Sequence, residues 1–592
     1  MKTTLQIALL FILISSCSRP QTEIQNTELP PISTVYDSFY EGSLALDPLM
    51  GNFLGINRYY DTIPNNLTIA FREKEELHYQ THLDKIKQYN RELLSESEQV
   101  NYDIIVWLSK NKLETDPAFV RYFPIDQFKS LNLTIAQFAS GSSAQPFVTV
   151  EDYENWIKRL ECYTIWLDTA MVNMKKGISL GYVHPKSIVK KVIPQFEQMA
   201  TTQLEDHLFF MPVKNMPNEF SEEEKIKIDA KYRQMVKEEI IPRYQALTKF
   251  FQTDYLESSR STSGIGQLPS GSDYYKNQIE YWTTTTLPAD SIFNLGMSEV
   301  ARIRNEMEKV KIEVGFEGDL LDFFKQVRTN KDLMPYSDPQ EVLDNFNNIH
   351  ERMRPQLEKL FTGKPKTPFI VKRTEAFREK SASAQYNPGS PDGSRAGTFY
   401  VPIPEVEAYN VYADEDLFLH EAIPGHHYQV MLALENESIP SFRKFTMSGA
   451  YVEGWALYTE SLGKELGLYT DPYQYFGMLS AEMHRAIRLV VDVGLHHKGW
   501  TREEAIAFSL KNEAESEASI ISEIERYMIL PAQALSYKIG QLTILRLRQE
   551  AEHTLAEKFN IKEFHSIILD NGDMPLSILQ NRVRNWILET RK

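Results

Sequence analysis

Apolar residues recur at helical spacing over most of the chain. Three long stretches, residues 221–252, 287–314 and 501–530, carry amphipathic helical patterns with capping residues at their starts. The segment from Thr367 to Tyr409 differs, because β-branched and aromatic runs alternate there with Gly, Pro and Asn. The pattern therefore predicts a large, mainly α-helical protein with a small β-sheet, and "GTFYVPI", residues 397–403, is expected to form one of its strands.

No repeat or low-complexity linker interrupts this pattern after residue 33. The pattern predicts one mainly helical body over residues 34–592. Two lobes around a cleft are the alternative arrangement, with a helical N-terminal part that ends near residue 290.

The N-terminal "MKTTLQIALLFILISSC" has an early lysine, an apolar run too short to cross a membrane, and small residues before Cys17. Residues 14–17 resemble a bacterial lipobox, so we expect residues 1–17 to be a lipoprotein signal peptide that ends at an acylated Cys17. A plain signal peptide is the alternative. Residues 18–33 are polar and proline-bearing and predict a flexible tether. With Cys17 lipidated, no intramolecular disulfide can form, and Cys162 is expected to be a small buried hydrophobe.

The composition limits the kinds of partner that the protein is expected to bind. The chain has 592 residues, 42% hydrophobic and 24% charged, and a formal net charge of −17. This is typical of a soluble globular protein. The negative charge disfavours nucleic acid and anionic membrane surfaces. We expect a location in the bacterial cell envelope, with contact to the membrane only through the lipid anchor.

The stretch "LHEAIPGHHYQ", residues 419–429, carries the candidate chemistry. Zinc peptidases commonly use H-E-x-x-H, in which two histidines one helical turn apart hold zinc and the glutamate contacts its water. Here Pro424 stands where the second histidine would be, and histidines follow at His426 and His427. Proline must kink or bulge a helix, and a bulge of one or two residues would bring His426 onto the face of His420.

A catalytic zinc site needs a third protein ligand and an open position. Glu453 and Glu460 fall on one face of a later predicted helix, and a carboxylate from that helix would complete a site of two histidines and one glutamate. Glu421 would then be the general base. The alternative is an ordinary polar helix, but a proline inside such a helix costs about 3 kcal/mol without any gain.

Several longer segments resemble the bacterial family labelled domain of unknown function 885. They are "LDPLMGNFLGINRYYDTIPN", "SPDGSRAGTFYVP", "FLHEAIPGHHYQ", "YVEGWALYTESLG", "RLVVDVGLHHKGW" and "PAQALSYKIGQLTILRLR". The resemblance covers about residues 35–590. It implies a zincin-like metallopeptidase body, with the small β-sheet beside the active-site helix, in a family that contains many exported lipoproteins.

A more distant similarity to thimet-type oligopeptidases implies individual roles. Their H-E-F-G-H motif and later V-E helix correspond to "HEAIPGH" and "YVEGWALYTE". On this similarity His420, His426 and Glu453 hold zinc and Glu421 is the base. The two extra residues in the first motif leave His427 as an alternative to His426.

Further roles follow from the same similarity. A donor to the oxyanion is expected from a later helix; the candidates in order are Tyr537, His496 and Tyr527, and a core position is the alternative for Tyr537. Residues that could contact the substrate are Arg485, Arg488 and Tyr527, although both arginines could equally pair with nearby acids. Candidates for orienting a ligand histidine are Glu460 and Asp492. The edge of the strand at residues 397–403 is a candidate for pairing with an extended substrate.

The sequence thus predicts an exported, lipid-anchored zinc metallopeptidase that acts on short peptides. Two alternatives remain open at this point. One is a zinc amidase or esterase with a non-peptide substrate, and the other is a non-catalytic lipoprotein that keeps the fold.

Overall fold

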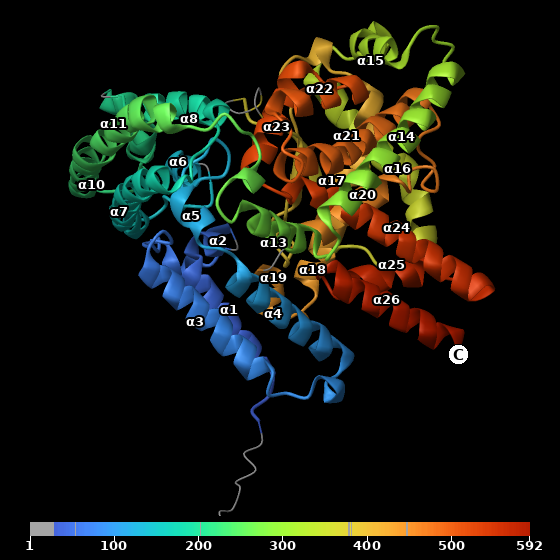
Figure 1. The fold of residues 1–592 in the computed structure, drawn as a ribbon, viewed down its shortest axis with the longest axis horizontal. Helices are drawn as coiled ribbons and strands as arrows, with labels where there is room; N and C mark the ends of the chain where they lie inside the picture. Colours follow the sequence, from blue (N-terminus) through green and yellow to red (C-terminus); the bar gives the residue numbers. More distant parts are fainter. Residues whose placement is uncertain are drawn as a thin grey trace, which may run out of the picture.

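Helices make up most of the protein, as a computed structural model shows (Figure 1). The structure describes residues 29–53, 55–141, 143–201, 203–376, 379, 382–445 and 448–592. The first helices are α1 (Ser33–Leu46), α2 (Pro48–Phe53), α3 (Ile69–Ile86), α4 (Glu96–Glu114), α5 (Ala118–Tyr122), α6 (Leu131–Ala139), α7 (Val150–Leu180), α8 (Lys186–Met199), α9 (Met211–Lys214), α10 (Glu222–Gln234), α11 (Ile241–Phe250) and α12 (Leu256–Ser258).

The remaining elements contain the sheet and the candidate site. They are α13 (Gly271–Thr283), α14 (Ala289–Glu313), α15 (Leu320–Thr329), α16 (Pro339–Leu360), β1 (Phe369–Arg373), β2 (Gln385–Asn387), β3 (Gly397–Val401), α17 (Asp414–Glu421), α18 (His426–Glu435), α19 (Ser441–Phe445), α20 (Gly449–Glu460), α21 (Pro472–His496), α22 (Arg502–Asn512), α23 (Glu517–Ile529), α24 (Ser536–Leu555), α25 (Ile561–Leu569) and α26 (Leu576–Arg591). The predicted class, mainly α with a small sheet, is confirmed.

Buried hydrophobic residues form two clusters. The smaller draws on α6, α7, α8, α10 and α11, which lie together on the left in Figure 1. The larger is built mainly from α13 to α26, and it also includes Phe39 of α1 and Ile104 of α4. The first helices are therefore packed with the body that contains the candidate site. A division into two lobes around a cleft remains a prediction.

The three long amphipathic patterns fold in different ways. Residues 287–314 form the single helix α14. Residues 221–252 form α10 and α11 with a π-helical stretch between them. Residues 501–530 form two helices, α22 and α23, because the Ser516 side chain accepts the Ser519 N–H and starts a new helix there.

The sheet has the order β1-β3-β2, with β1 parallel and β2 antiparallel to β3. β3 contains most of "GTFYVPI", so the predicted strand is present. However, β3 is the central strand and both of its edges are paired. The expectation that its edge binds an extended substrate is therefore wrong.

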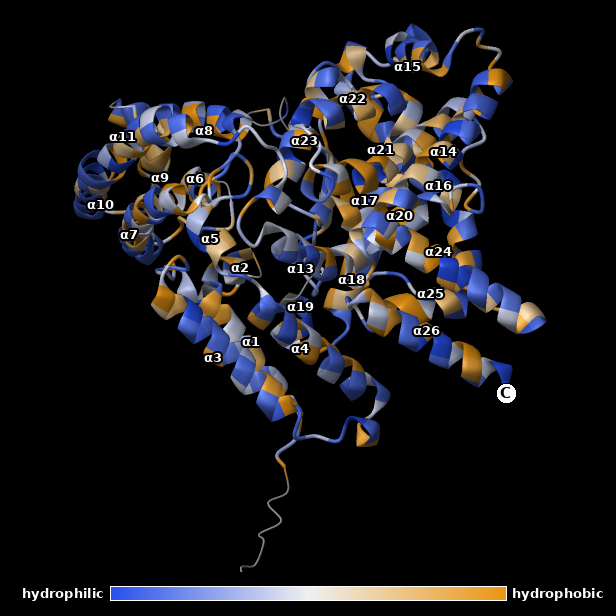
Figure 2. Cartoon of the chain, viewed as in Figure 1, coloured by the Kyte–Doolittle hydropathy of each residue, from blue (hydrophilic) through white to orange (hydrophobic). Residues whose placement is uncertain are grey.

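Helices α20 and α24 touch through their backbones. A Cβ atom added to Gly454 would lie 2.4 Å from Cα of Gly540, and one added to Gly540 would lie 2.0 Å from the carbonyl oxygen of Ala450. Only glycine permits this approach. The contact brings together the turns of the two helices that carry Glu453 and Tyr537. α14 packs along α21 beside them. Figure 2 shows that α21 is mainly hydrophobic, whereas α10, in another part of the molecule, is mainly hydrophilic.

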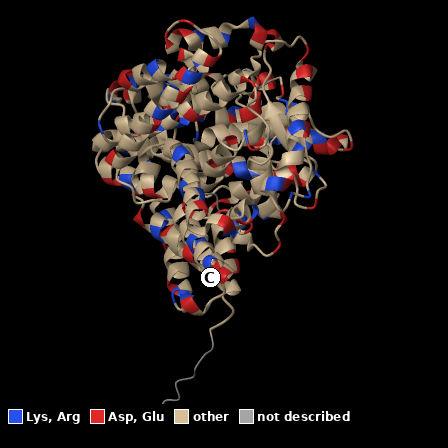
Figure 3. Cartoon of the chain, turned by 90° about the vertical axis from the view of Figure 1, so that its right-hand side faces the viewer, with Lys and Arg blue, Asp and Glu red and all other residues tan. Residues whose placement is uncertain are grey.

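The described residues include only a small part of the N-terminal segment for which a signal peptide and a tether were predicted. The signal peptide with Cys17, and most of the tether, lie outside the described residues. None of the described helices has the length and apolarity needed to cross a bilayer. Cys162 is half-buried against the smaller cluster rather than fully buried. Acidic and basic residues are interspersed over the side of the molecule drawn in Figure 3.

Candidate metal centre

The histidine motif is split between two helices. α17 ends at Glu421, α18 begins at His426, and the four residues 422–425 between them are not helical. A Cβ atom on Gly425 would lie 2.0 Å from the carbonyl oxygen of His420, so this turn requires glycine. Trp455 of α20 donates its indole N–H to the carbonyl oxygen of Pro424 at 2.8 Å. The helix is therefore interrupted, rather than kinked or bulged as the sequence suggested.

The turn brings His420 and His426 side by side, with ring centroids 4.7 Å apart. Nε2 of each histidine lies 3.6 Å from the same oxygen, Oε2 of Glu453. The three side chains together form a group whose ligand atoms all lie within 4.8 Å of one another. The structure thus brings together the three residues expected to hold a metal.

These distances fit a metal better than direct pairing. A separation of 3.6 Å is too long for a good hydrogen bond. Zinc with N and O ligands at about 2.0–2.1 Å holds tetrahedral ligand atoms about 3.4 Å apart. Oε2 of Glu453 is buried and has no hydrogen-bond partner among the described residues. A buried, unpartnered carboxylate oxygen between two imidazoles is costly unless a cation binds there.

The same geometry shifts the pKa values of the candidate ligands. Burial lowers the pKa of His420, but the nearby carboxylates of Glu453 and Glu460 outweigh it and raise that pKa to about 10. Burial raises the pKa of Glu453, but the nearby imidazoles of His420 and His426 outweigh it and hold that pKa well below its usual range. The two carboxylates therefore stabilise positive charge at His420.

Glu460 orients His420. Its Oε1 lies 2.6 Å from Nδ1 of His420, and the Glu460 side chain is only 1% exposed. This bond places a proton on Nδ1 and leaves Nε2 as the nitrogen that would bind a metal. One helical turn before His420, Asp416 is also buried, and burial followed by the charge of Glu460 raises its pKa well above the usual range. The sequence analysis missed Asp416, although its spacing of four from His420 was a visible signal.

His427 lies outside the cluster. Its Nδ1 is 2.8 Å from the hydroxyl of Tyr386, and its ring packs against Phe369 at a centroid distance of 5.0 Å. Burial lowers its pKa to about 4. The geometry thus favours His426 over His427 as the ligand.

Glu421 is buried as the last residue of α17, with 8% exposure. It directly follows the candidate ligand His420, and its charge is the last of the contributions that raise the pKa of His420. The role of Glu421 as general base remains a prediction.

Tyr537, near the start of α24, lies within electrostatic range of Glu453. Burial, and next the charge of Glu453, raise its pKa. The guanidinium carbon of Arg488 lies 4.5 Å from the centroid of the Tyr537 ring. A phenol in this position has its proton available for donation at neutral pH, as an oxyanion donor must.

The two arginines and Tyr527 are already engaged. Arg488 donates from Nε to the Tyr527 hydroxyl at 2.8 Å and from Nη2 to Glu523 at 3.0 Å. The Tyr527 hydroxyl in turn donates to Glu523 at 2.6 Å. Arg485 donates from Nη1 to the carbonyl oxygen of Ala481 at 3.2 Å. For Arg488 this is the acid pairing that was the alternative to a substrate role, whereas Arg485 bonds to a backbone carbonyl. Nη1 of Arg488 and Nε of Arg485 have no partner among the described residues.

His496 and Asp492 are not brought to the cluster. Nδ1 of His496 accepts the backbone N–H of Ile265 and Nε2 donates to the carbonyl oxygen of Tyr527, both at 3.0 Å. Asp492 accepts the Tyr275 hydroxyl at 2.7 Å and the backbone N–H of Ala532 at 3.1 Å. Both predicted site roles are corrected, because these bonds fix core packing and reach no histidine of the cluster.

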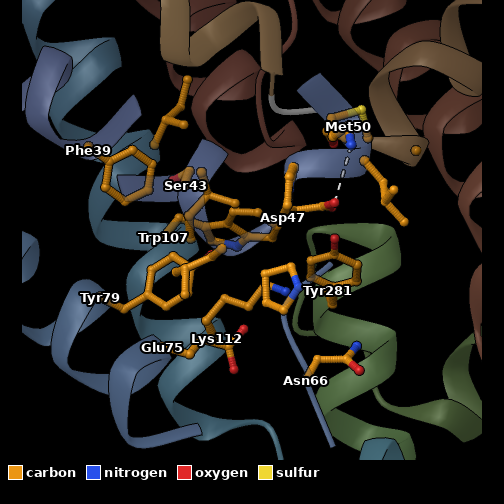
Figure 4. Close-up of a pocket in the computed structure, with 18 of the residues that line it drawn as sticks. Phe39, Ser43, Asp47, Met50, Asn66, Glu75, Tyr79, Trp107, Lys112 and Tyr281 are labelled. Atoms are coloured by element: carbon orange, nitrogen blue, oxygen red, sulfur yellow. Dashed lines mark hydrogen bonds between the residues drawn. The ribbon is translucent and has the colours of Figure 1, made fainter. Parts of the chain in front are cut away.

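Two cavities differ in their relation to the candidate metal centre. One, of about 330 Å³, has His426 and Glu453 in its wall. The other, of about 430 Å³, lies among α1, α3, α4 and α13 and is lined by residues such as Tyr79, Lys112 and Tyr281 (Figure 4). Asp573 borders both cavities. Of these two cavities, only the one of about 330 Å³ is lined by candidate metal ligands.

Comparison with known proteins agrees with this fold. Residues 48–583 match the family described as "Bacterial protein of unknown function (DUF885)", and the chain belongs to this family. The predicted resemblance to it is confirmed. No curated protein matches the sequence.

Two solved structures are similar to this one. A candidate lipoprotein from Colwellia psychrerythraea has 26% sequence identity and a TM-score of 0.83, over 94% of this chain and 99% of that one. A candidate lipoprotein of unknown function from Shewanella oneidensis has 19% identity and a TM-score of 0.75, over 93% of this chain and 99% of that one. The second likeness concerns the fold alone.

Proposed function

We propose that this protein is a zinc-dependent metallopeptidase of zincin-like type that hydrolyses short peptides. One observation carries the proposal: Nε2 of His420 and Nε2 of His426 both lie 3.6 Å from an unpartnered Glu453 oxygen. Two imidazoles and one carboxylate are the ligand set of several zinc peptidases.

The surrounding residues supply the rest of the chemistry. Zinc in such a site acts as a Lewis acid that makes water a nucleophile at neutral pH. Glu421 accepts the proton of this water and passes it to the leaving amine. Tyr537 donates a hydrogen bond to the carbonyl oxygen as negative charge develops on it. Glu460 holds His420 in place.

The test uses the full chain. Zinc per chain is measured by elemental mass spectrometry, and hydrolysis is measured on a mixed peptide library. We expect about one zinc per chain, and we expect Glu421→Gln to keep zinc while losing roughly 10²–10⁴-fold in rate. His420→Ala should lose both, whereas Glu437→Gln, at an exposed position after α18, should lose neither.

Three outcomes would overturn the proposal. One is purified protein that binds no zinc. Another is hydrolysis of esters or non-peptide amides but not of peptides. The third is full complementation of a deletion strain by Glu421→Gln, which would indicate a non-catalytic lipoprotein.

We further propose that the protein is exported and anchored to the cell envelope through Cys17. The support is the lipobox-like sequence and the similarity to a candidate lipoprotein. Metabolic labelling with a fatty acid should mark the wild-type protein and not Cys17→Ser. Labelling of both, or of neither, would contradict a lipid anchor at this cysteine.

A further inference from the structure

The cavity of about 330 Å³ opens directly onto the candidate metal ligands. One face of α18 forms a wall: after His426 come Gln429, Val430, Ala433 and Leu434, which follow the helical repeat. A ligand in this cavity is therefore in contact with the residue that would hold the metal. The wall that extends away from His426 is mainly apolar.

Residues from two other segments of the cavity lining are also apolar. They include Ile439 from the segment before α19, and Val452 from α20, immediately before Glu453. Both walls thus carry an aliphatic surface that begins beside a metal ligand. Apolar surface of this kind gains free energy by covering an apolar side chain.

Several polar groups in the lining are tied to their neighbours. Arg443 donates to Asn101 at 2.8 Å and to the carbonyl oxygens of Asn571 and Asp573. Lys444 donates to the carbonyl oxygen of Leu434 at 3.0 Å. These bonds hold the walls in place.

Gln429 supplies a different feature. Its Oε1 is buried and has no hydrogen-bond partner among the described residues, although its Nε2 donates to the carbonyl oxygen of Tyr451 at 3.4 Å. Gln429 lies on the turn that follows His426, and its bond to Tyr451 joins this part of the wall to α20.

The size of the cavity fits one large side chain. An apolar cavity of about 150 Å³ is enough to bind benzene. A volume of about 330 Å³ therefore accommodates a leucine or phenylalanine side chain together with part of its backbone.

We infer that this cavity is the specificity pocket for a residue next to the cleaved bond, and that it selects branched aliphatic or aromatic side chains. The inference rests on the proposed peptidase function. Ala433 and Val430 line its apolar wall.

The test compares selectivities within each enzyme preparation. Quenched fluorescent peptides vary one residue on either side of the cleaved bond, which is located by mass spectrometry. At one of these positions, we expect kcat/KM for Leu or Phe to exceed that for Gly or Asp by about tenfold or more. Equal rates at both positions would overturn the inference.

Two variants of opposite effect locate the preference in this cavity. Ala433→Leu fills the pocket and should lower the Phe-to-Ala ratio of kcat/KM by about tenfold, whereas Val430→Ala widens it and should raise the Phe-to-Leu ratio. A ratio measured in one preparation does not depend on the fraction of folded enzyme. Unchanged ratios in both variants would place the preference elsewhere and overturn the inference.

A binding measurement separates this inference from the proposed function. Leucine hydroxamate and glycine hydroxamate share the metal-binding group and differ by one isobutyl side chain. We expect the zinc-loaded protein to bind the leucine compound about tenfold more tightly, and Ala433→Leu to remove that advantage. If no peptide is hydrolysed but this ratio holds, peptidase function fails and the pocket stands; if peptides are hydrolysed but the ratio is one, the pocket fails.

Discussion

Oε1 of Glu460 lies 2.6 Å from Nδ1 of His420, across a sequence separation of 40 residues. The glutamate lies at the end of α20, the helix that also carries Glu453. One helix therefore supplies both a candidate ligand and the group that orients another. The arrangement makes the affinity for metal depend on a residue that does not touch the metal.

Glu460→Gln should weaken zinc binding by about 10–100-fold, because glutamine keeps the shape but loses the charge that orients and polarises His420. Competition against a chelator of known affinity measures the change. Glu437→Gln is the matched control at an exposed position. Equal zinc affinity in Glu460→Gln and wild type would show that Glu460 is only a packing residue.

His426→Ala and His427→Ala should have separable effects. The first should lose zinc, since it removes a ligand. The second should retain zinc and lower the free energy of unfolding by about 1–3 kcal/mol, because it leaves the partly buried Tyr386 hydroxyl without its 2.8 Å hydrogen bond to His427. Zinc content and thermal unfolding distinguish the two. A reversed pattern would make His427 the ligand.

Gly425→Ala should abolish zinc binding. The added methyl group would meet the carbonyl oxygen of His420 at 2.0 Å, so the turn between α17 and α18 cannot keep its shape. Gly363→Ala is the matched control, because an added Cβ there has no neighbour within 4 Å. If Gly425→Ala bound zinc as wild type does, the turn would not be what joins the two histidines.

Asp492 should make stability depend on pH. Burial raises its pKa to about 7, although hydrogen bonds from Tyr275 and Ala532 act against burial. In the unfolded chain the pKa is about 3.9. The folded state therefore binds this proton more tightly, and the free energy of unfolding should fall as pH rises from about 4 to about 7.

In Asp492→Asn, the side chain cannot ionise, so thermal stability should fall less steeply between pH 5 and pH 8 than in wild type. The corresponding difference in unfolding free energy is roughly 2–4 kcal/mol over that range. Asp84→Asn, at an exposed position, is the control. Parallel pH profiles of Asp492→Asn and wild type would contradict the raised pKa.

The metal ligands could be predicted from sequence because they lie in dense, ordered motifs. His420, His426 and Glu453 all fell in segments that resemble one family, and the structure brings them together. The sequence predicted a kink or bulge at Pro424 and did not predict the break. Trp455 bonds the Pro424 carbonyl from another helix, and such a contact leaves no local pattern.

The failed site predictions have the same cause. His496 is a residue type suited to catalysis, but its two ring nitrogens bond to the backbones of Ile265 and Tyr527. The strand order likewise could not be read from the alternation of residues 397–403, since alternation shows a strand but not its neighbours. The mainly helical class could be predicted because the periodicity of apolar residues is a property of the local sequence.

The contact between Gly454 and Gly540 fixes how α20 and α24 approach each other without any side chain. Glu453 and Tyr537 therefore keep their relation whatever residues line the cavity beside them. On the proposed peptidase function, related chains can exchange wall residues such as Val430 or Ala433 and change which peptides they accept, while Glu453 and Tyr537 keep their places. Substrate choice and bond cleavage are then free to evolve separately.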